Sequence, residues 1–471
     1  MRLKKFKHFK LLIIVIFILS ILFYFTFNKQ ASVNLPFITQ KKYNVIFFAF
    51  DGLQSKHLSR YGYNLDLTPN LNKILDSSYL FTQAISPSSW TIPTYMSIFT
   101  SLYPSEHKLV NKFTEFDKKA AKIVQSNLKN LSPDVVTLAQ LLKEKGYQTA
   151  AFTGDAGVSS VYGYNLGFDE YYDGPPFGGF PDTIPRAAEW LKKRTGSPFF
   201  LFIHGYDVHG QFEPEKGFDY RFVKKPYRGK YTGSKNEQAA LREEGLAKGK
   251  LNLTEEDVLF WRAIYDEKIS RADEEFKLFW DTVNELNLNN NTVFVIFSDH
   301  GTEIYEHGTF DHGHTLYSEL VNVLLAIKLP HQASGITIND LISTIDVLPT
   351  LLSILKIQHP NPDILKGVDL TPAFGGINVS HNVYSETDYR LYTHKRSVQT
   401  PDGWKLILTL NENSRELYNL KVDSNELNNL AESELTKTYE LEQDIFRHLK
   451  KMGDDNDWTI GCLPVYADQC Q

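Results

Sequence analysis

The stretch NVIFFAFDG at residues 44–52 and the stretch TVFVIFSDHG at residues 292–301 decide the fold of this chain. Each begins with a largely apolar run and then reaches an aspartate that glycine follows closely. Strands that are apolar throughout are buried on both faces, as in a parallel sheet that helices cover on both sides. We therefore expect an α/β fold with a doubly wound, mostly parallel sheet.

Other segments fit the same architecture. Further buried strands are expected at 148–153 (QTAAFT) and 198–204 (PFFLFIH). At 135–145 the apolar residues recur every three or four positions, which predicts a helix that Gly146 ends. A polar stretch at about 211–256 suggests an insertion or lid, and the short strand patterns after about residue 375 predict a small C-terminal α+β subdomain.

The composition excludes several classes of protein. The 471 residues are 42% hydrophobic and include 32 Phe and 25 Tyr, enough for a large core, so disorder is excluded as the main state. The formal net charge of −6 argues against a nucleic-acid partner. Only two cysteines occur, Cys462 and Cys470, which excludes a disulfide framework and a cysteine zinc cluster. Outside the cytoplasm this pair could close a small loop or stay free.

The N-terminal residues predict a membrane anchor. Residues 1–10 carry five Lys or Arg and no acidic residue, and the next 17 residues are uncharged and mostly apolar. As a helix they span about 25 Å, the short end of what crosses a bilayer. The positive-inside rule keeps the basic end cytoplasmic. A cleaved signal peptide or a buried soluble helix are the alternatives.

These boundaries give the expected organisation of a single-pass cell-membrane protein whose catalytic domain lies outside the cytoplasm. Its parts are a basic cytoplasmic segment at 1–10, a transmembrane anchor at 11–28, a linker at 29–41, a catalytic domain at 42–375, and a C-terminal subdomain with a tail at 376–471.

Acidic and imidazole side chains follow several of the expected strands. Asp51 and Asp299 follow two of them directly, His204 ends a third, and His209 comes shortly after it. Ligands of open α/β sheets bind outside the carboxyl ends of the strands, so these groups would converge at one edge. A lone Asp after a strand is usually only a turn or cap residue. Two of them with His beside one favour a functional site.

Histidine is concentrated in one glycine-rich and acidic stretch. His300, His307, His312 and His314 lie in SDHGTEIYEHGTFDHGHTLY. Each one alone is more often a surface or structural residue than a functional one. Because His is the commonest metal ligand and a general acid at neutral pH, the cluster as a whole favours a site.

A hydroxyl group completes the constellation. Pro93 suits the first turn of a helix that runs on to Thr100, so Thr91 would lie at its N-terminus, where an anion is favoured. Touching a metal held by Asp51 and Asp299, this hydroxyl could attack a tetrahedral oxyanion ester. The alternative is that Thr91 only caps the helix.

These motifs, in this order, resemble the sulfatase family of the alkaline-phosphatase superfamily over about residues 42–432. The resemblance implies a metal held by Asp51, Asp299 and His300. It also implies that Thr91 is the nucleophile and touches the metal, that His209 binds the sulfate or phosphate group, and that His312, or His314 as second choice, serves the leaving oxygen. The similar segments are residues 44–74, 86–107, 199–214, 297–327, 345–357, 403–408 and 415–432.

The sequence also departs from the family pattern. Thr91 cannot become the formylglycine that sulfatases make from Cys or Ser, Tyr95 replaces an Arg, and Gly52 replaces a second metal Asp. The GKWHLG segment that is typical of the family is not recognisable near residues 154–157 of this chain. Thr at this position is similar instead to lipoteichoic acid synthases, phosphoethanolamine transferases and nucleotide phosphodiesterases. His300 stands where calcium-dependent members carry Asn, which favours zinc or manganese, with calcium possible.

The sequence therefore favours a membrane-anchored, metal-dependent hydrolase of sulfuric or phosphoric esters that forms a covalent intermediate on Thr91. Its substrate would be a sulfated or phosphorylated glycan or a lipid head group. One alternative is a phosphotransferase that moves a lipid head group onto an envelope glycan. Another is a non-catalytic, sulfatase-like binding protein, which the missing Arg and Lys positions motivate.

Overall fold

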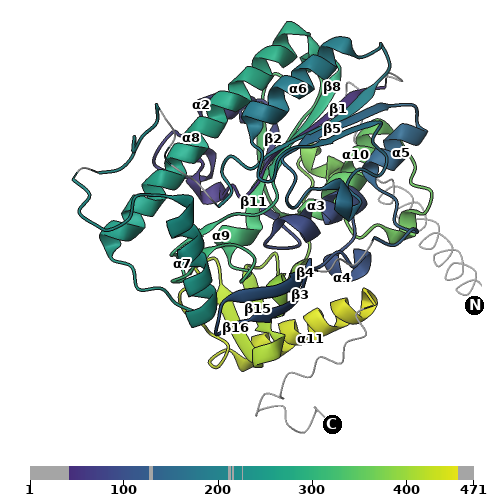
Figure 1. The fold of residues 1–471 in the computed structure, drawn as a ribbon. Helices are drawn as coiled ribbons and strands as arrows, with labels where there is room; N and C mark the ends of the chain where they lie inside the picture. The colour runs from purple at the N-terminus through teal and green to yellow at the C-terminus, as the bar shows by residue number, and fades with distance from the viewer. Residues whose placement is uncertain (1–41, 127–130, 211–213, 215–216, 225, 454–471) are drawn as a thin grey trace, which may run out of the picture. The chain divides into compact units, whose positions relative to one another are not determined.

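The computed structural model of the chain describes residues 42–126, 131–210, 214, 217–224 and 226–453 (Figure 1). The predicted cytoplasmic segment, anchor and linker lie outside the described residues, as do Cys462 and Cys470. Within the described part, every helix is too short or too polar to cross a bilayer.

The centre of the fold is an eight-stranded sheet in the order β12-β2-β11-β8-β1-β7-β5-β6. Its central strand β1 runs parallel to both of its neighbours, whereas β11 is antiparallel to β2 and β8. The prediction of a mostly parallel sheet is therefore confirmed. The strands are β1 (Asn44–Phe50), β2 (Tyr79–Ile85), β5 (Gln148–Thr153), β6 (Glu170–Asp173), β7 (Phe199–Gly205), β8 (Thr292–Ser298), β11 (Asn322–Lys328) and β12 (Ile336–Ser343).

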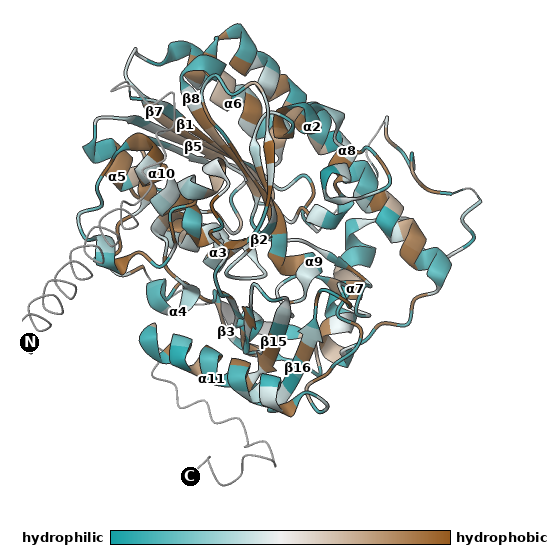
Figure 2. Cartoon of the chain, turned by 180° about the vertical axis from the view of Figure 1, so that it is seen from behind, coloured by the Kyte–Doolittle hydropathy of each residue, from teal (hydrophilic) through white to brown (hydrophobic). Residues whose placement is uncertain are grey.

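Helices cover both faces of this sheet because successive residues of a buried strand point to opposite sides. On one face Phe48 packs against Phe180 and Phe276, with ring centroids 4.8 and 5.0 Å away. On the other face Phe47 lies 6.0 Å from Phe99. Figure 2 shows the hydrophobic strands between helices whose outer surfaces are hydrophilic. The first face carries α2 (Pro69–Leu75), α6 (Phe180–Lys193) and α8 (Glu255–Glu285), and the second carries α3 (Thr91–Thr100), α5 (Leu138–Glu144) and α10 (Val347–Leu355).

One predicted helix begins later than expected. Instead of starting at residue 135, α5 begins at Leu138. The Thr137 side chain accepts a hydrogen bond from the backbone N–H of Gln140, and the Gln140 side chain accepts one from the backbone N–H of Thr137. This reciprocal pair forms a capping box, which sets the first turn of the helix.

A second, antiparallel sheet follows the main one, as predicted for the C-terminal part. Its order is β13-β14-β15-β16. Leu441, Ile445 and Leu449 of the last helix pack on its apolar side chains. These elements are β13 (Val383–Thr387), β14 (Lys395–Gln399), β15 (Trp404–Thr409), β16 (Ser414–Asn419) and α11 (Leu435–Lys451).

Short elements lie between the strands of the main sheet along the chain. They are α4 (Pro104–His107), the hairpin of β3 (Phe113–Asp117) and β4 (Lys122–Ser126), α7 (Lys235–Lys248), the pair β9 (Glu303–Ile304) and β10 (Phe310–Asp311), and α9 (Ser318–Val321). The polar stretch predicted to form an insertion or lid contains α7.

Candidate active site

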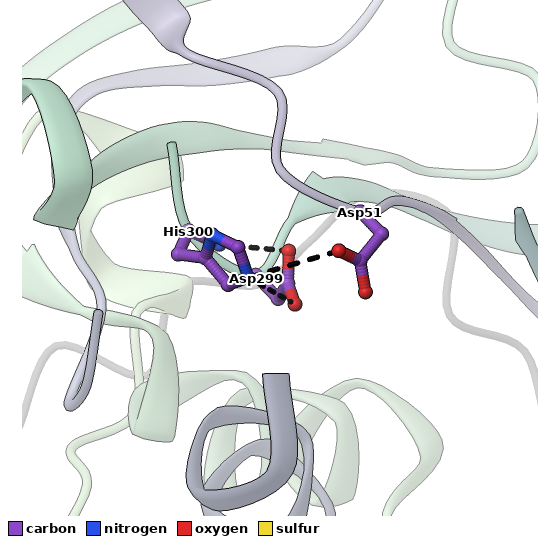
Figure 3. A group of neighbouring side chains, drawn as sticks. All are labelled: Asp51, Asp299 and His300. Atoms are coloured by element: carbon purple, nitrogen blue, oxygen red, sulfur yellow. Dashed lines mark hydrogen bonds and ion pairs between the residues drawn. The ribbon is translucent and has the colours of Figure 1, made fainter. Parts of the chain in front are cut away.

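Two neighbouring strands bring Asp51 and Asp299 together. Phe50 at the end of β1 is in register with Ser298 at the end of β8, so the next residue of each strand is an aspartate at the same sheet edge. Both carboxyl groups are fully buried. With His300 they form a compact group whose ligand atoms all lie within 4.8 Å of one another (Figure 3).

Each carboxylate has one oxygen that the protein satisfies. Asp299 Oδ1 accepts hydrogen bonds from the backbone N–H groups of Gly52 (3.1 Å) and His300 (2.8 Å). Asp51 Oδ2 lies 3.0 Å from Nε2 of His204. The remaining oxygens, Asp51 Oδ1 and Asp299 Oδ2, are buried without a hydrogen-bond partner among the described residues. Buried oxygens of this kind are costly unless a cation or a proton meets them.

The imidazole rings at this edge offer lone pairs to the same point. Nδ1 of His300 donates to the carbonyl of Gly301 (2.7 Å), which leaves Nε2 facing the carboxylates and the Thr91 hydroxyl. This Nε2 lies 3.3 Å from Asp299 Oδ2 and 3.7 Å from Asp51 Oδ1. His209 is oriented alike, with Nδ1 donating to the Gly210 carbonyl (2.7 Å) and Nε2 3.9 Å from Asp51 Oδ1. An imidazole whose orientation a backbone carbonyl fixes suits the donor set of a metal site, and His300 meets this condition within the group of Asp51, Asp299 and His300.

The pKa values follow from burial. Burial raises the pKa of Asp51 to about 7, and burial together with the charge of Asp51 raises the pKa of Asp299 to about 7. A cation between the two carboxylates would offset this cost and keep both ionised at neutral pH. His204 behaves differently, because burial lowers its pKa to about 3 and leaves the ring neutral.

His204 acts on Asp51 rather than on a ligand. The backbone N–H of Gly154 approaches its Nδ1 at 3.4 Å, so the ring proton is on Nε2 and is donated to Asp51. His204 therefore fixes the orientation of Asp51. The register of the parallel strands places His204 opposite Ala49, two residues before Asp51. A strand-end histidine on a neighbouring strand was the sequence signal for this role.

Thr91 is the first residue of α3 and faces the group of Asp51, Asp299 and His300. The helix is preceded by Trp90 at its N-cap position. The hydroxyl oxygen of Thr91 lies 3.2 Å from Nε2 of His300. A Cβ atom at Gly157 would lie 2.6 Å from Cγ2 of Thr91, so only glycine permits the backbone to pass this close. Thr91 is thus held between the 154–157 loop and the carboxylate group.

The departures from the family pattern have structural counterparts. Gly52 has a φ of +71°, and a Cβ there would lie 3.1 Å from the backbone of His209, so an aspartate at this position would be strained. Tyr95 is fully buried with its ring edge-on to His204 at 5.2 Å. Burial and the nearby charge of Asp299 raise the pKa of Tyr95 well above its usual range, so this position carries no charge.

The four histidines of the 300–314 stretch separate into two pairs. The ring of His312 stacks on His300 with centroids 4.4 Å apart and lies 4.8 Å from His209. His314 and His307 pair with glutamates instead. Nε2 of His314 lies 2.8 Å from the Glu303 carboxylate, and Nδ1 of His307 lies 2.6 Å from the Glu319 carboxylate. Both His312 and His314 were predicted candidates for serving the leaving oxygen. The structure brings His312 to the group of Asp51, Asp299 and His300, and it places His314 beside Glu303.

Asp311 and Arg242 extend the site beyond the predicted residues. Nδ1 of His312 pairs with Asp311, whose second oxygen lies 3.4 Å from Nη1 of Arg242. Burial opposes ionisation of Asp311, but His312 and Arg242 hold its pKa well below the usual range. Burial lowers the pKa of His312 to about 4, so the ring is neutral at pH 7. Asp311 was recognisable as the residue before His312, whereas nothing in the sequence singles out Arg242.

Comparison with known proteins agrees with this arrangement. The profile of the sulfatase family matches residues 43–357, and that of the C-terminal region of N-sulphoglucosamine sulphohydrolase matches residues 305–455. The N-acetylglucosamine-6-O-sulfatase of Bacteroides thetaiotaomicron is 22% identical, with 88% of each chain covered.

Solved structures share the fold. A protein solved in complex with its substrate D-glucosamine-2-N,6-O-disulfate superposes with a TM-score of 0.70 at 19% identity, covering 88% of this chain and 99% of that one. The phosphonate monoester hydrolase of Agrobacterium radiobacter gives a TM-score of 0.67 at 18% identity, covering 88% and 96%. The match of the family profile over most of the chain, together with the buried acidic and imidazole group at the sheet edge, shows that the chain belongs to the sulfatase family of hydrolases.

Proposed function

We propose that this chain is a metal-dependent hydrolase that cleaves sulfate or phosphate esters of a glycan or a lipid head group through a covalent intermediate on Thr91. The observation that carries the proposal is the position of the Thr91 hydroxyl. It lies 3.2 Å from His300, beside two buried carboxylate oxygens that have no hydrogen-bond partner among the described residues. A nucleophile and a ligand set are thus adjacent.

Asp51, Asp299 and His300 would hold the metal, and Thr91 would touch it. Carboxylate oxygens with an imidazole nitrogen suit zinc or manganese, and calcium is possible. When bound, the cation supplies positive charge that favours the alkoxide form of Thr91 and offsets negative charge on the ester oxygens.

The residues of the chain divide the proton transfers between them. Thr91 Oγ1 forms a bond to sulfur or phosphorus while the bond to the alcohol oxygen breaks. His312, oriented by Asp311, accepts the proton of Thr91 and gives it to the leaving oxygen. Water then attacks the sulfur or phosphorus, and the bond to Thr91 Oγ1 breaks. The Thr91 hydroxyl regains a proton, and sulfate or phosphate departs. His209 would bind the oxygens of the transferred group only with a proton on Nε2, because its Nδ1 already donates to the Gly210 carbonyl.

The relatives support a sulfated sugar as the substrate. An N-acetylglucosamine-6-O-sulfatase and a protein solved with a disulfated glucosamine are both similar to this chain over most of its length. A phosphate ester stays part of the proposal because Thr91 is similar to the nucleophile of enzymes that carry a phosphoryl group. Transfer to an alcohol of an envelope glycan would use the same intermediate.

We also propose that residues 11–28 anchor the chain in the cell membrane with the catalytic domain outside the cytoplasm. Support comes from the uncharged run that follows five basic residues in the first ten. Protease accessibility of the catalytic domain in intact cells tests the orientation, and digestion only after lysis would contradict it.

The function is tested on the purified full chain in detergent. We would assay p-nitrophenyl sulfate beside the mono- and diester p-nitrophenyl phosphates, before chelation, after chelation, and after return of zinc, manganese or calcium. We expect at least one of these esters to be hydrolysed. Chelation should abolish this hydrolysis, and one of these metals should restore it. Turnover that survives complete removal of metal would contradict the metal-dependent mechanism. Product formed only when a glycan acceptor is added would favour the transferase.

A further inference from the structure

A group of three cationic side chains lies beside the candidate active site, and only Arg242 among them contacts a residue used in the mechanism above, Asp311. Lys112 precedes β3, Arg242 lies on α7, and Arg390 follows β13. These segments are far apart in the sequence, and both β3 and α7 lie near the C-terminal sheet (Figure 1). We call Lys112, Arg242 and Arg390 the cation cluster.

The cluster adjoins His312 through shared contacts. Arg242 reaches Asp311, the carboxylate that orients His312, at 3.4 Å. Tyr389, the residue before Arg390, has its ring 6.1 Å from that of His312. Trp90, the residue before Thr91, packs edge-on against the same tyrosine at 5.3 Å. Tyr389 therefore lies between the catalytic side chains and the cation cluster.

A single aromatic ring joins Lys112 to the rest of the cluster. The ammonium of Lys112 lies 5.4 Å from the ring centre of Phe113, and the guanidinium of Arg390 lies 5.6 Å from the same ring. That ring also meets Tyr389 edge-on at 6.4 Å. Two cations on one aromatic side chain attract the ring but repel each other, so the arrangement favours an anion between them.

The carboxylates of the cluster are already engaged. Glu243 is shared, with one oxygen 2.9 Å from Nε of Arg242 and both oxygens 3.0 Å from Nη1 of Arg390. Asp311 is shared between Arg242 and His312. Lys112 is left without a hydrogen-bond or ion-pair partner within the part of the chain that the structure describes.

The surroundings of Lys112 do not favour its charge. Burial, and then the charges of Arg390 and Arg242, lower its pKa, while Asp155 acts in the opposite sense. A half-buried lysine with cationic neighbours and no carboxylate in contact gains most from a ligand that is itself an anion.

We propose that Lys112, with Arg242 and Arg390 behind it, binds a sulfate or carboxylate group of a glycan substrate other than the ester that reacts at Thr91. The inference rests on the proposed function for the identity of the reacting group. It assigns to the substrate at least two anionic groups, one at the catalytic residues and one at the cation cluster, with Tyr389 between them.

The test measures binding rather than turnover. The full chain carrying Thr91→Ala would be titrated by calorimetry with a heparin-derived tetrasaccharide, which carries several sulfate and carboxylate groups, and with p-nitrophenyl sulfate, which carries one anionic group. Adding Lys112→Met should weaken tetrasaccharide binding about 10-fold, the effect of losing one charge-assisted hydrogen bond. Lys112→Arg should restore most of the affinity.

Lys119→Met is the matched control, because Lys119 is an exposed lysine in the turn of the same β3–β4 hairpin. It should leave the affinity unchanged. Since Lys112 donates no hydrogen bond to a described residue and its charge is disfavoured by burial and by Arg390, its substitution should not lower the thermal unfolding temperature.

Three results would overturn the inference. They are unchanged tetrasaccharide affinity after Lys112→Met, an equal loss for Lys119→Met, and equal weakening of tetrasaccharide and p-nitrophenyl sulfate. The last result would place Lys112 at the reacting group. Binding through Lys112 by a chain that hydrolyses no ester would overturn the proposed function and leave this inference standing, so the two failures are distinguishable.

Discussion

His300 and His312 share one short stretch of sequence with His307 and His314, but the two pairs have different partners. His300 and His312 stack on each other beside carboxylate oxygens that have no hydrogen-bond partner among the described residues. His307 and His314 each pair directly with a buried glutamate. In the first pair, Nε2 of His300 and the neighbouring carboxylate oxygens therefore have capacity for a ligand. In the second pair, the fold engages both ring nitrogens of His307 and Nε2 of His314.

The second pair is part of a buried network that joins the loop to the C-terminal sheet. Glu303 accepts hydrogen bonds from the backbone N–H groups of His307 (3.0 Å) and Thr309 (2.8 Å). The backbone of Ser318 donates to Glu426, which also pairs with Lys405 of β15 at 2.7 Å. Buried charges persist in proteins when they are paired and hydrogen-bonded in this way. The histidines of this stretch thus indicate function where they lie beside carboxylate oxygens that have no partner among the described residues, as His300 and His312 do.

The largest expected effect comes from removing the nucleophile on the catalytic side of this comparison. Thr91→Ala should lower kcat/KM by about 10⁴-fold or more, because the covalent step is lost. Steady-state kinetics on the best p-nitrophenyl ester measures this loss. The unfolding temperature should stay at the wild-type value, and Thr91→Ser should keep part of the activity. Wild-type turnover in Thr91→Ala would rule out the mechanism.

The two histidine pairs can be compared directly by matched substitutions. His312→Gln should lower kcat by about 10²-fold, the usual contribution of a positioned acid or base. His314→Gln should change kcat much less, because its imidazole binds Glu303 and not the catalytic group. Rates would be normalised to folded protein by circular dichroism. Equal losses of kcat in the two variants would remove the distinction between the pairs.

The loop that closes over Thr91 gives a smaller effect. Gly157→Ala adds a methyl group that would lie 2.6 Å from Thr91, so the hydroxyl must shift. We expect a loss of about 10-fold in kcat, since small displacements of a reacting group are costly. Gly196→Ala is the control, because a Cβ at that position meets no atom within 4 Å. If both variants keep the wild-type kcat, the close packing on Thr91 has no catalytic role.

On the structural side of the comparison, His307→Gln should affect stability and leave kcat almost unchanged. Glu319 would stay buried without its partner, which should lower the free energy of unfolding by about 3 kcal/mol. Urea titration of both chains at pH 7 measures the difference. A large loss of kcat with unchanged stability would show that His307 belongs to the catalytic group.

The pH dependence of stability tests the same ion pair. Burial opposes the charged form of His307, but Glu319 outweighs it and raises the pKa of His307 to about 9. Because the folded state holds this proton more tightly, the stabilisation is complete below about pH 6.5 and is lost as the pH rises through about 9. The free energy of unfolding of His307→Gln should therefore fall less than that of the wild type as the pH rises from about 6.5 through about 9.

Much of this fold was predictable from local sequence. The apolar runs gave the bounds of β1 and β8 correctly, and their parallel pairing placed Asp51 beside Asp299. The start of α5 was predicted wrongly, although the capping pair of Thr137 and Gln140 was readable. Local patterns decide such features because the interacting residues are close in sequence or repeat with the period of the element.

The rest depended on contacts between distant segments. The four histidines of the 300–314 stretch are alike in sequence, and only the folded loop shows which of them reach Glu303 and Glu319. Arg242 lies in a polar helix like any other exposed arginine until that helix is placed beside Asp311. Partner identity of this kind follows from tertiary packing, so a single sequence does not determine it.

Bound metal tests the central claim most directly. Elemental analysis would be made on the purified wild-type chain, on Asp299→Ala from the group beside Thr91, and on His307→Gln from the structural network. We predict stoichiometric zinc, manganese or calcium in the wild type and in His307→Gln, and its loss together with activity in Asp299→Ala. Stoichiometric metal retained in Asp299→Ala would contradict the assignment of Asp51, Asp299 and His300 as its ligands.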